Sequence, residues 1–342
     1  MVTVFVTHNP EDLDAYYGRA LPALQAIAHV VVNPLKRDLT TGELIAAAAG
    51  CDVIVAHRST PGEAELFDAL PGLLAFLRCA VDISTVDVSA ASAAGVLVGR
   101  ADKSFVRSTA ELGLALMLDL ARNVTESTID YRASATAPQR PGVQLHGRTA
   151  GIIGYGAIGA YLAQLLRGLG MHVLVCDPVA KAAARAADDG FERCELHELL
   201  GRSHFVLPLA PASPSTDNMI DADALARMRP GTMLVNVSRG ELLDEEAVVA
   251  ALDSGHLGGL AVDVGRADDQ RPSPTLTGRP GVVATPHLGG LTPENADAQA
   301  MSSVEQVRAI IDGVVPPRAV NAEHARRLRS WWDAGARNEE TP

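Results

Sequence analysis

The sequence lacks several features that would place it in a special class of protein. No stretch approaches the ~20 apolar residues that a helix needs to cross a bilayer. The start, MVTVFVTHNP, has no basic region followed by a long apolar core, so we interpret it as a first strand and not as a secretory signal. Only four cysteines occur, none of them in a C-x-x-C pair, and they are interpreted as small core residues. We therefore expect a cytoplasmic protein that holds no metal.

Positive charge is also scarce. The 29 Lys and Arg residues are outnumbered by 41 Asp and Glu residues, which gives a net charge of −12. This acidic balance argues against nucleic acid and anionic membrane as partners. It does not argue against a small anionic substrate, because a local arginine can override the global field. The length of 342 residues is sufficient for two domains with substantial cores.

Strand and helix signals alternate along the chain in two series. The first series fills residues 1 to about 100, and the second runs from residue 147 to about 289. Such alternation predicts parallel sheets with helices on both faces, so the fold class is α/β. An apolar helix at 104–123 is expected to be buried between the two bodies and to join them, and a long helix at 293–312 to return to the first body. The expected strands of the first series are 2–7, 30–33, 52–56, 73–79 and 96–98.

The stretch 151–178 combines an apolar strand, a glycine turn, a helical stripe, a second strand and an acid. Gly154, Gly156 and Gly159 stand in the order G-x-G-x-x-G, and Asp177 ends the second strand. In dinucleotide-binding folds the first glycine permits the tight turn, the second lets the backbone approach the pyrophosphate, and the third lets the helix pack against the strand. The helix N-terminus then supplies free N–H groups for the phosphates. We predict a dinucleotide site.

Asp177 also bears on the choice of cofactor. Its carboxylate can accept both hydroxyls of the adenosine ribose, and it would repel a 2′-phosphate. The next residue is Pro178 and not an arginine, so NAD is favoured over NADP. Lys181 and Arg185 lie close enough in sequence to keep NADP as the less favoured alternative.

Three strand ends in the second series each deliver one group suited to hydride transfer. Arg239 follows the strand expected at 233–237, the acidic pair at 268 and 269 follows 259–264, and His287 follows 282–285. Ligands of a doubly wound sheet lie outside the carboxyl ends of its strands. There an arginine can grip the carboxylate of a 2-oxo acid, a histidine can pass a proton to its oxygen, and an acid can orient the imidazole. The other nine histidines are interpreted as surface or structural residues.

The motifs that carry these residues resemble the D-isomer-specific 2-hydroxyacid dehydrogenase family, and within it the phosphoglycerate dehydrogenase-like members, over about residues 45–321. They are the glycine motif with Asp177, the stretch 235–245 around Arg239, and Thr285-Pro286-His287-Leu288-Gly289-Gly290. The resemblance implies two Rossmann-like or flavodoxin-like domains with parallel sheets, and usually a homodimer. The nucleotide-binding domain (103–290) would be inserted into a substrate domain made of 1–102 and 291–321, followed by a tail (322–342).

The resemblance also implies roles for single residues. Arg239 would bind the substrate, His287 would be the catalytic acid/base, and Asp268 would be the acid that pairs with it. Arg58 and Ser59 match an Arg-Ser pair that contacts substrate in phosphoglycerate-type members, although a structural role at a helix start is equally open. The implied NAD contacts, besides the glycines, are Ala157, Ile158, Asp177, Val237, Ser238, Arg239 and Asp263.

Two positions depart from the family pattern. The family usually has Glu followed by Pro where this chain has Asp268 and Asp269, so the carboxylate is one methylene, about 1.5 Å, shorter. The loop Ala80-Val81-Asp82 stands where the family has a G-x-G loop whose N–H groups hold the substrate carboxylate. Ala80 and Asp82 would adopt a positive φ with more strain than glycine, and an aspartate would repel a carboxylate. An unusual substrate or a lost activity is implied.

The leading hypothesis is an NAD-dependent oxidoreductase that acts on a small 2-hydroxy or 2-oxo acid. The alternative is an NAD(H)-binding regulatory or scaffold protein on the same fold, which the altered loop at 80–82 favours and the presence of Arg239 and His287 opposes. A phosphite-type oxidation is a remote third hypothesis. The sequence leaves open which acid is used and in which direction. It also leaves open whether Trp331 and Trp332 anchor on a neighbouring subunit or belong to a poorly ordered end.

Overall fold

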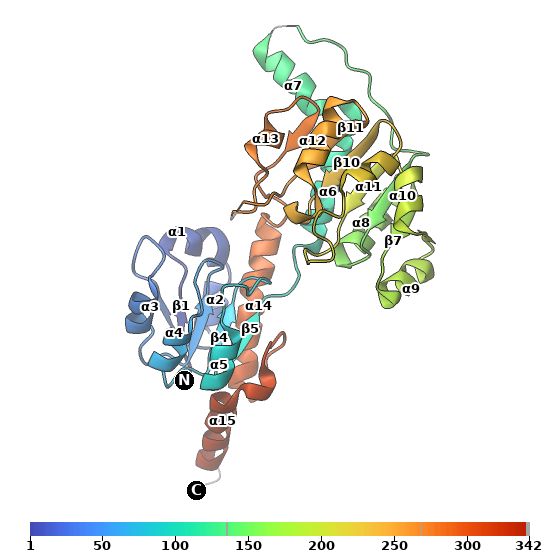
Figure 1. Ribbon diagram of the computed structural model, residues 1–342. Helices are drawn as coiled ribbons and strands as arrows, with labels where there is room; N and C mark the ends of the chain where they lie inside the picture. The colour runs from blue at the N-terminus through green and yellow to red at the C-terminus, as the bar shows by residue number, and fades with distance from the viewer. Residues whose placement is uncertain (135, 268, 340–342) are drawn as a thin grey trace. The chain divides into compact units, whose positions relative to one another are not determined.

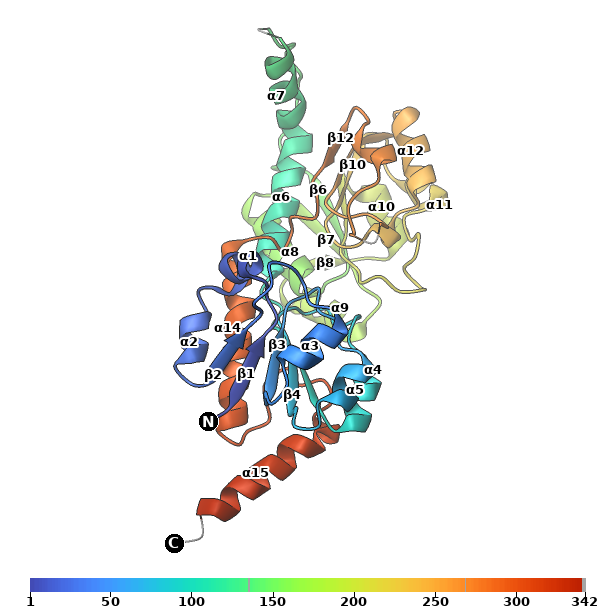
Figure 2. The ribbon, with the colours of Figure 1, turned by 90° about the vertical axis from the view of Figure 1, so that its left-hand side faces the viewer.

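The computed structural model describes residues 1–134, 136–267 and 269–339 (Figures 1 and 2). The chain folds into two units: one consists of Met1–Ser104 and the chain from Pro293 onward, and the other of Phe105–Thr292. Each unit is a parallel sheet with helices on its faces, so the predicted α/β class is confirmed. No helix within the described residues is both long and apolar enough to cross a membrane.

The first unit is built on a five-stranded parallel sheet with the strand order β2-β1-β3-β4-β5. Its strands are β1 (Thr3–Val6), β2 (His29–Val32), β3 (Val53–Ala56), β4 (Ala75–Arg78) and β5 (Leu97–Arg100). Its helices are α1 (Pro10–Asp12), a π-helix (Leu13–Tyr17), α2 (Leu21–Gln25), α3 (Thr41–Ala47), α4 (Ala64–Ala69), α5 (Val88–Ala94), α14 (Pro293–Ile311), a 3-10 helix (Ala322–His324) and α15 (Arg326–Glu339). All five strands expected here are present.

The second unit is built on a seven-stranded parallel sheet with the order β12-β11-β10-β9-β6-β7-β8. Its strands are β6 (Thr149–Ile153), β7 (His172–Cys176), β8 (Glu192–Arg193), β9 (Phe205–Pro208), β10 (Thr232–Asn236), β11 (Leu257–Val262) and β12 (Val282–Ala284). Its helices are α6 (Val106–Arg122), α7 (Val124–Ala133), α8 (Ala157–Gly168), α9 (Ala180–Asp188), α10 (Leu196–Arg202), α11 (Ala222–Arg227), a 3-10 helix (Gly240–Leu242), α12 (Glu245–Asp253) and α13 (Pro274–Thr277). The strand order reverses at β6, so the turn after β6 lies at the topological switch point, where such sheets bind ligands.

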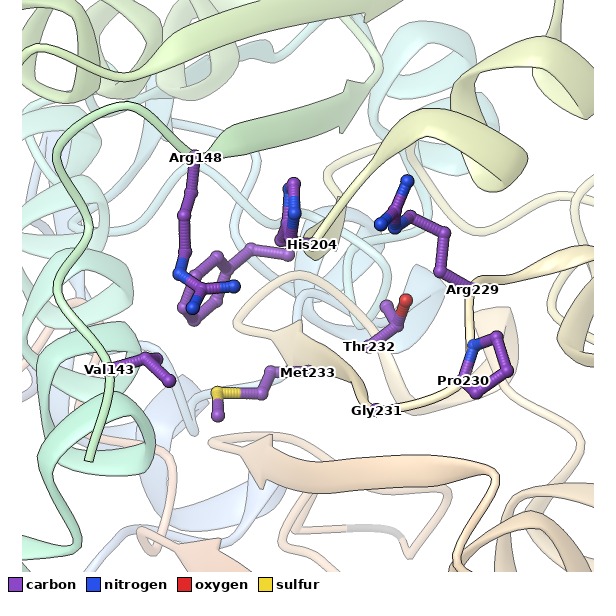
Figure 3. A pocket seen from close by; sticks show the side chains of 9 residues that line it. Val143, Arg148, His204, Arg229, Pro230, Gly231, Thr232 and Met233 are labelled. Atoms are coloured by element: carbon purple, nitrogen blue, oxygen red, sulfur yellow. The ribbon is translucent and has the colours of Figure 1, made fainter. Parts of the chain in front are cut away.

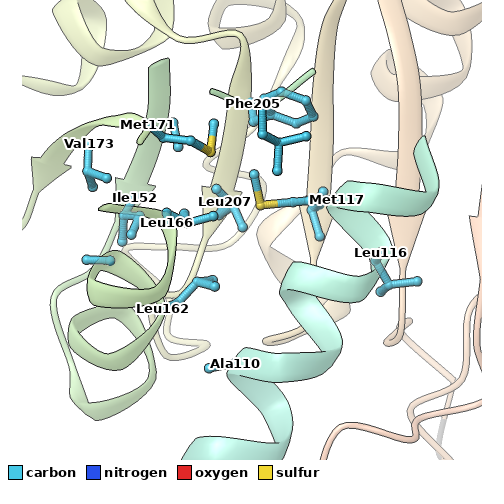
Figure 4. Close-up of a cluster of buried hydrophobic side chains, with 14 of the residues drawn as sticks. Ala110, Leu116, Met117, Ile152, Leu162, Leu166, Met171, Val173, Phe205 and Leu207 are labelled. Carbon is cyan, nitrogen blue, oxygen red and sulfur yellow. The ribbon is translucent and has the colours of Figure 1, made fainter. Parts of the chain in front are cut away.

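Both faces of the second sheet are buried, which is why its strands are continuous apolar runs in the sequence. Successive side chains of a strand point to opposite faces. Ile152 belongs to the cluster under α6 and α8, whereas Ile153 belongs to the cluster under α10, α11 and α12. Figure 4 shows the first cluster, where Met117 of α6 and Leu166 of α8 meet side chains of β6, β7 and β9.

The long apolar helix has the predicted extent to within two residues but differs from its prediction in its burial. It was expected to be apolar on every side and buried between two bodies, but α6 has an outer side on which Leu118 is 41% exposed. The helix ends at Arg122, one residue before its predicted end, because Asn123 adopts a left-handed conformation with φ 54°. A second helix, α7, then begins, and it has no buried residue. The sequence patterns did not predict α7.

The C-terminal segment packs on the first unit. The indole N–H of Trp332 donates to the carbonyl of Ile310 at 2.8 Å, and the ring packs against the core of that unit. Leu328 of the same helix is fully buried. Trp332 therefore belongs to an ordered helix that is anchored on its own chain, and a contact of Trp331 or Trp332 with a neighbouring subunit stays a prediction.

Candidate active site

The glycine turn has the close contacts that the motif predicts. Gly154 has φ 101°, a conformation that other residues rarely adopt, and it lies against the backbone of Leu209. A Cβ on Gly159 would lie 2.2 Å from the carbonyl oxygen of Gly154, so only glycine allows this helix to start against the strand. A Cβ on Gly156 would meet no atom within 4 Å, so the space above this residue is open.

The N-terminus of α8 is arranged to hold an anion. Gly156 is its N-cap residue and provides no side-chain cap, so the N–H groups of Ala157 and Ile158 point toward the open side of the turn. Free N–H groups and the helix dipole together favour a phosphate at such a terminus. The turn therefore fits the pyrophosphate of a dinucleotide.

Asp177 lies beside this turn, as expected. One carboxylate oxygen accepts the N–H of Tyr155 at 2.6 Å, and the other accepts the N–H of Val179 at 2.8 Å. These bonds fix the carboxylate and leave lone pairs on both oxygens, since a carboxylate offers about four acceptor positions. The half-buried Asp177 can thus still receive the two ribose hydroxyls.

Three residues that support the turn were missed from the sequence. Arg185 donates to the carbonyls of Tyr155 (2.5 Å) and Gly156 (2.9 Å), and its guanidinium lies 5.0 Å from the centre of the Tyr155 ring. The Tyr155 hydroxyl donates to Asp189 at 2.7 Å. The glycine turn is therefore held by Arg185, which lies on α9, and by Asp189, which directly follows α9. Arg185 was considered above only as a possible partner of a 2′-phosphate.

Arg239 is delivered by a tight loop after β10. The fully buried Asn236 donates to the carbonyl of Arg239 at 2.7 Å and accepts the N–H of Ser238 at 3.0 Å. Ser238 in turn donates to the carbonyl of Ala210 at 2.8 Å. This network fixes the backbone while the Arg239 side chain stays exposed. Asn236 had no assigned role in the sequence analysis.

The loops after β10 and β11 are in direct contact. A Cβ on Gly240 would lie 2.2 Å from the backbone of Gly265, so this approach requires glycine. Arg266 joins the two loops further by donating to the carbonyl of Glu241 at 2.9 Å and to that of Leu243 at 3.2 Å. Asp268, the predicted acidic partner of His287, lies outside the described residues.

The loop that carries His287 is held by a buried carboxylate. Asp263, at the end of β11, accepts the hydroxyl of Thr285 (2.6 Å) and the N–H groups of Leu288 (2.7 Å) and Gly289 (2.8 Å). Asp263 is 0% exposed. His287 itself has φ 61°, a conformation that costs non-glycine residues about 1–3 kcal/mol and persists only where the surroundings impose it. The bonds of Asp263 fix the chain on both sides of His287. The predicted contact of Asp263 with the cofactor stays a prediction.

In the first unit, Arg78 connects two loops that carry predicted substrate contacts. One loop contains Arg58 and Ser59, and the other contains Ala80–Asp82. The Arg78 guanidinium is 2% exposed and donates to the carbonyls of His57, Arg58 and Thr60 and to the Thr85 hydroxyl. Burial lowers the pKa of Arg78 to about 10, so the group stays charged at neutral pH. The Arg58 side chain is exposed, whereas the Ser59 hydroxyl donates to Asp38 at 2.6 Å.

The loop at 80–82 does not have the predicted strain. Ala80, Val81 and Asp82 all have ordinary negative φ values. The Asp82 carboxylate accepts the N–H and the hydroxyl of Ser84 at 2.9 and 3.1 Å, which is a local Asx turn. The expectation of strain is wrong because it assumed a positive φ at Ala80 and Asp82, and neither residue has one.

One polar group in the first unit was not singled out from the sequence. Asp12, Asp38 and His57 place ligand atoms within 4.8 Å of one another. Asn9 donates to Asp12 at 2.6 Å, and Ser59 contacts both Asp38 and the His57 Nδ1 (2.8 Å). These bonds make the group a hydrogen-bonded network that fixes Ser59, one of the predicted substrate contacts.

A family model and several known proteins match the chain. The model described as "D-isomer specific 2-hydroxyacid dehydrogenase, NAD binding domain" matches residues 114–289. D-3-phosphoglycerate dehydrogenase of Mycobacterium leprae is 37% identical over 282 residues, which is 82% of this chain and 53% of that protein. The chloroplastic D-3-phosphoglycerate dehydrogenase 3 of Arabidopsis thaliana is 33% identical over 287 residues, which is 83% of this chain and 49% of that protein. The chain thus spans about half the length of the curated relatives it matches.

Solved structures share the fold over nearly the whole chain. A protein from Thermus thermophilus has a TM-score of 0.78 and 29% identity, covering 93% of this chain and 100% of its own. The pyruvate reductase of Chlamydomonas reinhardtii has a TM-score of 0.78 and 26% identity, covering 92% of this chain and 98% of its own.

Proposed function

Since this chain belongs to the D-isomer specific 2-hydroxyacid dehydrogenase family and contains its NAD-binding domain, we propose that it is an NAD-dependent oxidoreductase acting on a small 2-hydroxy or 2-oxo acid. The bound nicotinamide would supply or accept the hydride. The observation that carries the proposal is the gathering of Arg239 and His287 on the loops after β10 and β12, at the sheet edge where the glycine turn lies.

The proposed roles follow from the chemistry of these side chains. Arg239 binds the substrate carboxylate through charge-assisted hydrogen bonds and polarises the carbonyl. His287 gives a proton to the carbonyl oxygen during reduction and takes it back during oxidation. Asp263 is a positioning residue, because its three hydrogen bonds hold the loop of His287. Arg58 and Ser59 are proposed to contact substrate from the first unit, and Asp268 to pair with His287.

Turnover on a panel of 2-oxo acids tests the proposal. We expect NADH oxidation with at least one of glyoxylate, hydroxypyruvate, pyruvate, phenylpyruvate, 2-oxoglutarate and oxaloacetate, with NADPH as the cofactor control. Binding of NADH without turnover on any of them would favour the regulatory alternative. The ordinary backbone of the loop at 80–82 removes the argument from strain that first supported that alternative. A cytoplasmic location stays an expectation.

Asp177→Ala is expected to weaken NADH binding by roughly 10-fold or more, the loss typical of a charged hydrogen-bonding partner. It should also narrow the preference for NADH over NADPH, because the charge that repels a 2′-phosphate is removed. Fluorescence titration with both cofactors measures this. Asp188→Ala, an exposed aspartate on α9, is the matched control for the change of charge. An unaltered preference in Asp177→Ala would show that another group reads the ribose.

We also propose that the protein is a homodimer and that α7 contributes to the interface. α7 has no buried residue, and Val124, Ile129 and Tyr131 are 54%, 52% and 66% exposed. In both ribbon views α7 extends away from the sheet of its own unit (Figures 1 and 2). Tyr131→Glu should shift the sedimentation of the protein from dimer to monomer, whereas Val314→Glu, at a position 58% exposed in the first unit, should not. A dimer that persists in the Tyr131 variant would remove α7 from the interface.

A further inference from the structure

A cavity of about 190 Å³ lies at the amino ends of β6, β9 and β10. This volume is more than ten times the ~10–15 Å³ that one ordered water requires. The glycine turn and Arg239 follow the carboxyl ends of β6 and β10, so the cavity is at the opposite edge of the same sheet. The residues that line it are Val143, Arg148, His204, Phe205, Arg229, Pro230, Gly231, Thr232 and Met233 (Figure 3).

The charged residues of this cavity all have the same sign. Arg148 and Arg229 lie on either side of His204 in the close-up, and no aspartate or glutamate lines the cavity (Figure 3). Within the part of the chain that the structure describes, neither arginine forms an ion pair with a carboxylate. Arg148 uses only one of its N–H groups, in a bond to the carbonyl of Gln144 at 3.1 Å. The lining of this cavity is therefore positively charged, although the protein has a net charge of −12.

His204 offers a further donor. Its Nδ1 accepts the backbone N–H of Thr149 at 3.1 Å, so the proton of the neutral ring is on Nε2. Burial and the charges of Arg229 and Arg148 lower the pKa of His204, which keeps the ring in this neutral form at pH 7. Nε2–H has no hydrogen-bond partner among the described residues, so it can donate to a ligand.

We propose that this cavity binds a phosphate group, either as free inorganic phosphate or as part of a small phosphate ester. Arginine guanidinium groups donate paired N–H bonds to phosphate oxygens, and the imidazole N–H of His204 is a further donor. The ligand would supply the negative charge that the lining residues lack. The site is distinct from the helix terminus that fits the cofactor pyrophosphate, because it lies at the other edge of the sheet.

Isothermal titration of the NADH-saturated protein tests the site, since the cofactor then blocks phosphate from the glycine turn. Inorganic phosphate and glycerol 3-phosphate are titrated separately at constant ionic strength, because exposed charges are screened by salt. We expect saturable binding of at least one of them to the unmodified protein. Arg148→Gln and Arg229→Gln should each weaken it roughly 10- to 100-fold, the loss typical of one charge-assisted partner.

Arg193→Gln is the matched control, because it removes a positive charge from an exposed position of the same unit that does not line the cavity. It should leave the affinity within about twofold of the unmodified protein, since distant surface charges contribute little. Binding of inorganic phosphate alone would identify the free ion as the ligand, and binding of the ester would identify a phosphorylated metabolite. Absence of saturable binding at millimolar phosphate, or equal affinities in all four proteins, would overturn the proposal.

Discussion

His287→Asn is expected to lower kcat roughly 10²- to 10⁴-fold while the affinity for NADH stays nearly unchanged. The variant removes the group that moves the proton, and this group acts in the transition state of the reaction. Asparagine is the suitable replacement because it tolerates the left-handed conformation that His287 adopts, with φ 61°. The folded loop should therefore persist. Steady-state kinetics and NADH titration on the same preparation measure the two quantities.

The control for this variant is His197→Asn, which changes an exposed histidine of α10 by the same chemistry. We expect turnover close to that of the unmodified protein. If His287→Asn also kept normal turnover, His287 would have no part in the proton transfer, and the proposed mechanism would lose its acid/base.

Asp263→Asn is expected to reduce both turnover and stability. The carboxylate accepts three hydrogen bonds in a fully buried position. In asparagine one of the two oxygens is replaced by an NH2 group, which cannot accept. At least one of the three donors would therefore lose its acceptor. A buried donor left unsatisfied costs about 1–3 kcal/mol, so the free energy of unfolding should fall by about this amount. The loop of His287 would also lose its fixed conformation, which should lower kcat by at least tenfold.

Asp244→Asn separates this effect from a general loss of stability. Asp244 is the N-cap residue of α12 and accepts the N–H of Ala247 at 3.1 Å, and asparagine caps helices nearly as well. We expect unchanged turnover and a change in unfolding free energy within about 0.5 kcal/mol in that control. Denaturant titration and kinetics compare the two variants. Normal turnover in Asp263→Asn would show that the loop of His287 is held by other contacts.

Much of the fold was predictable because its strands are short, parallel and buried on both faces. Such strands are continuous apolar runs, and the spacing of Gly154, Gly156 and Gly159 marks the turn at which a dinucleotide binds. The positions of Arg239 and His287 followed from the rule that ligands lie at the carboxyl ends of strands. Asp263 was also named, but its bonds to the loop after β12 depend on residues more than 20 positions away, which periodicity does not predict.

The elements that were missed have weak local signals. The apolar residues of α7 do not form a stripe on one side of the helix, and the strand β8 has only two residues. The cavity with Arg148, His204 and Arg229 draws its lining from three separate segments that only the sheet order brings together. The Ala80–Asp82 loop was misjudged because the family pattern was taken to fix its backbone conformation, which this chain does not share.

The proposed reaction is hydride transfer between the nicotinamide and C2 of a 2-oxo acid, and deuterium labelling follows the transferred hydrogen itself. The acceptor found in the panel is reduced with NADH that carries deuterium at both C4 positions, and the product is analysed by mass spectrometry and chiral chromatography. We expect one deuterium on C2 and, for every acceptor other than glyoxylate, whose product is achiral apart from the label, the D-isomer of the 2-hydroxy acid. A product without deuterium at C2, or the L-isomer, would contradict the account.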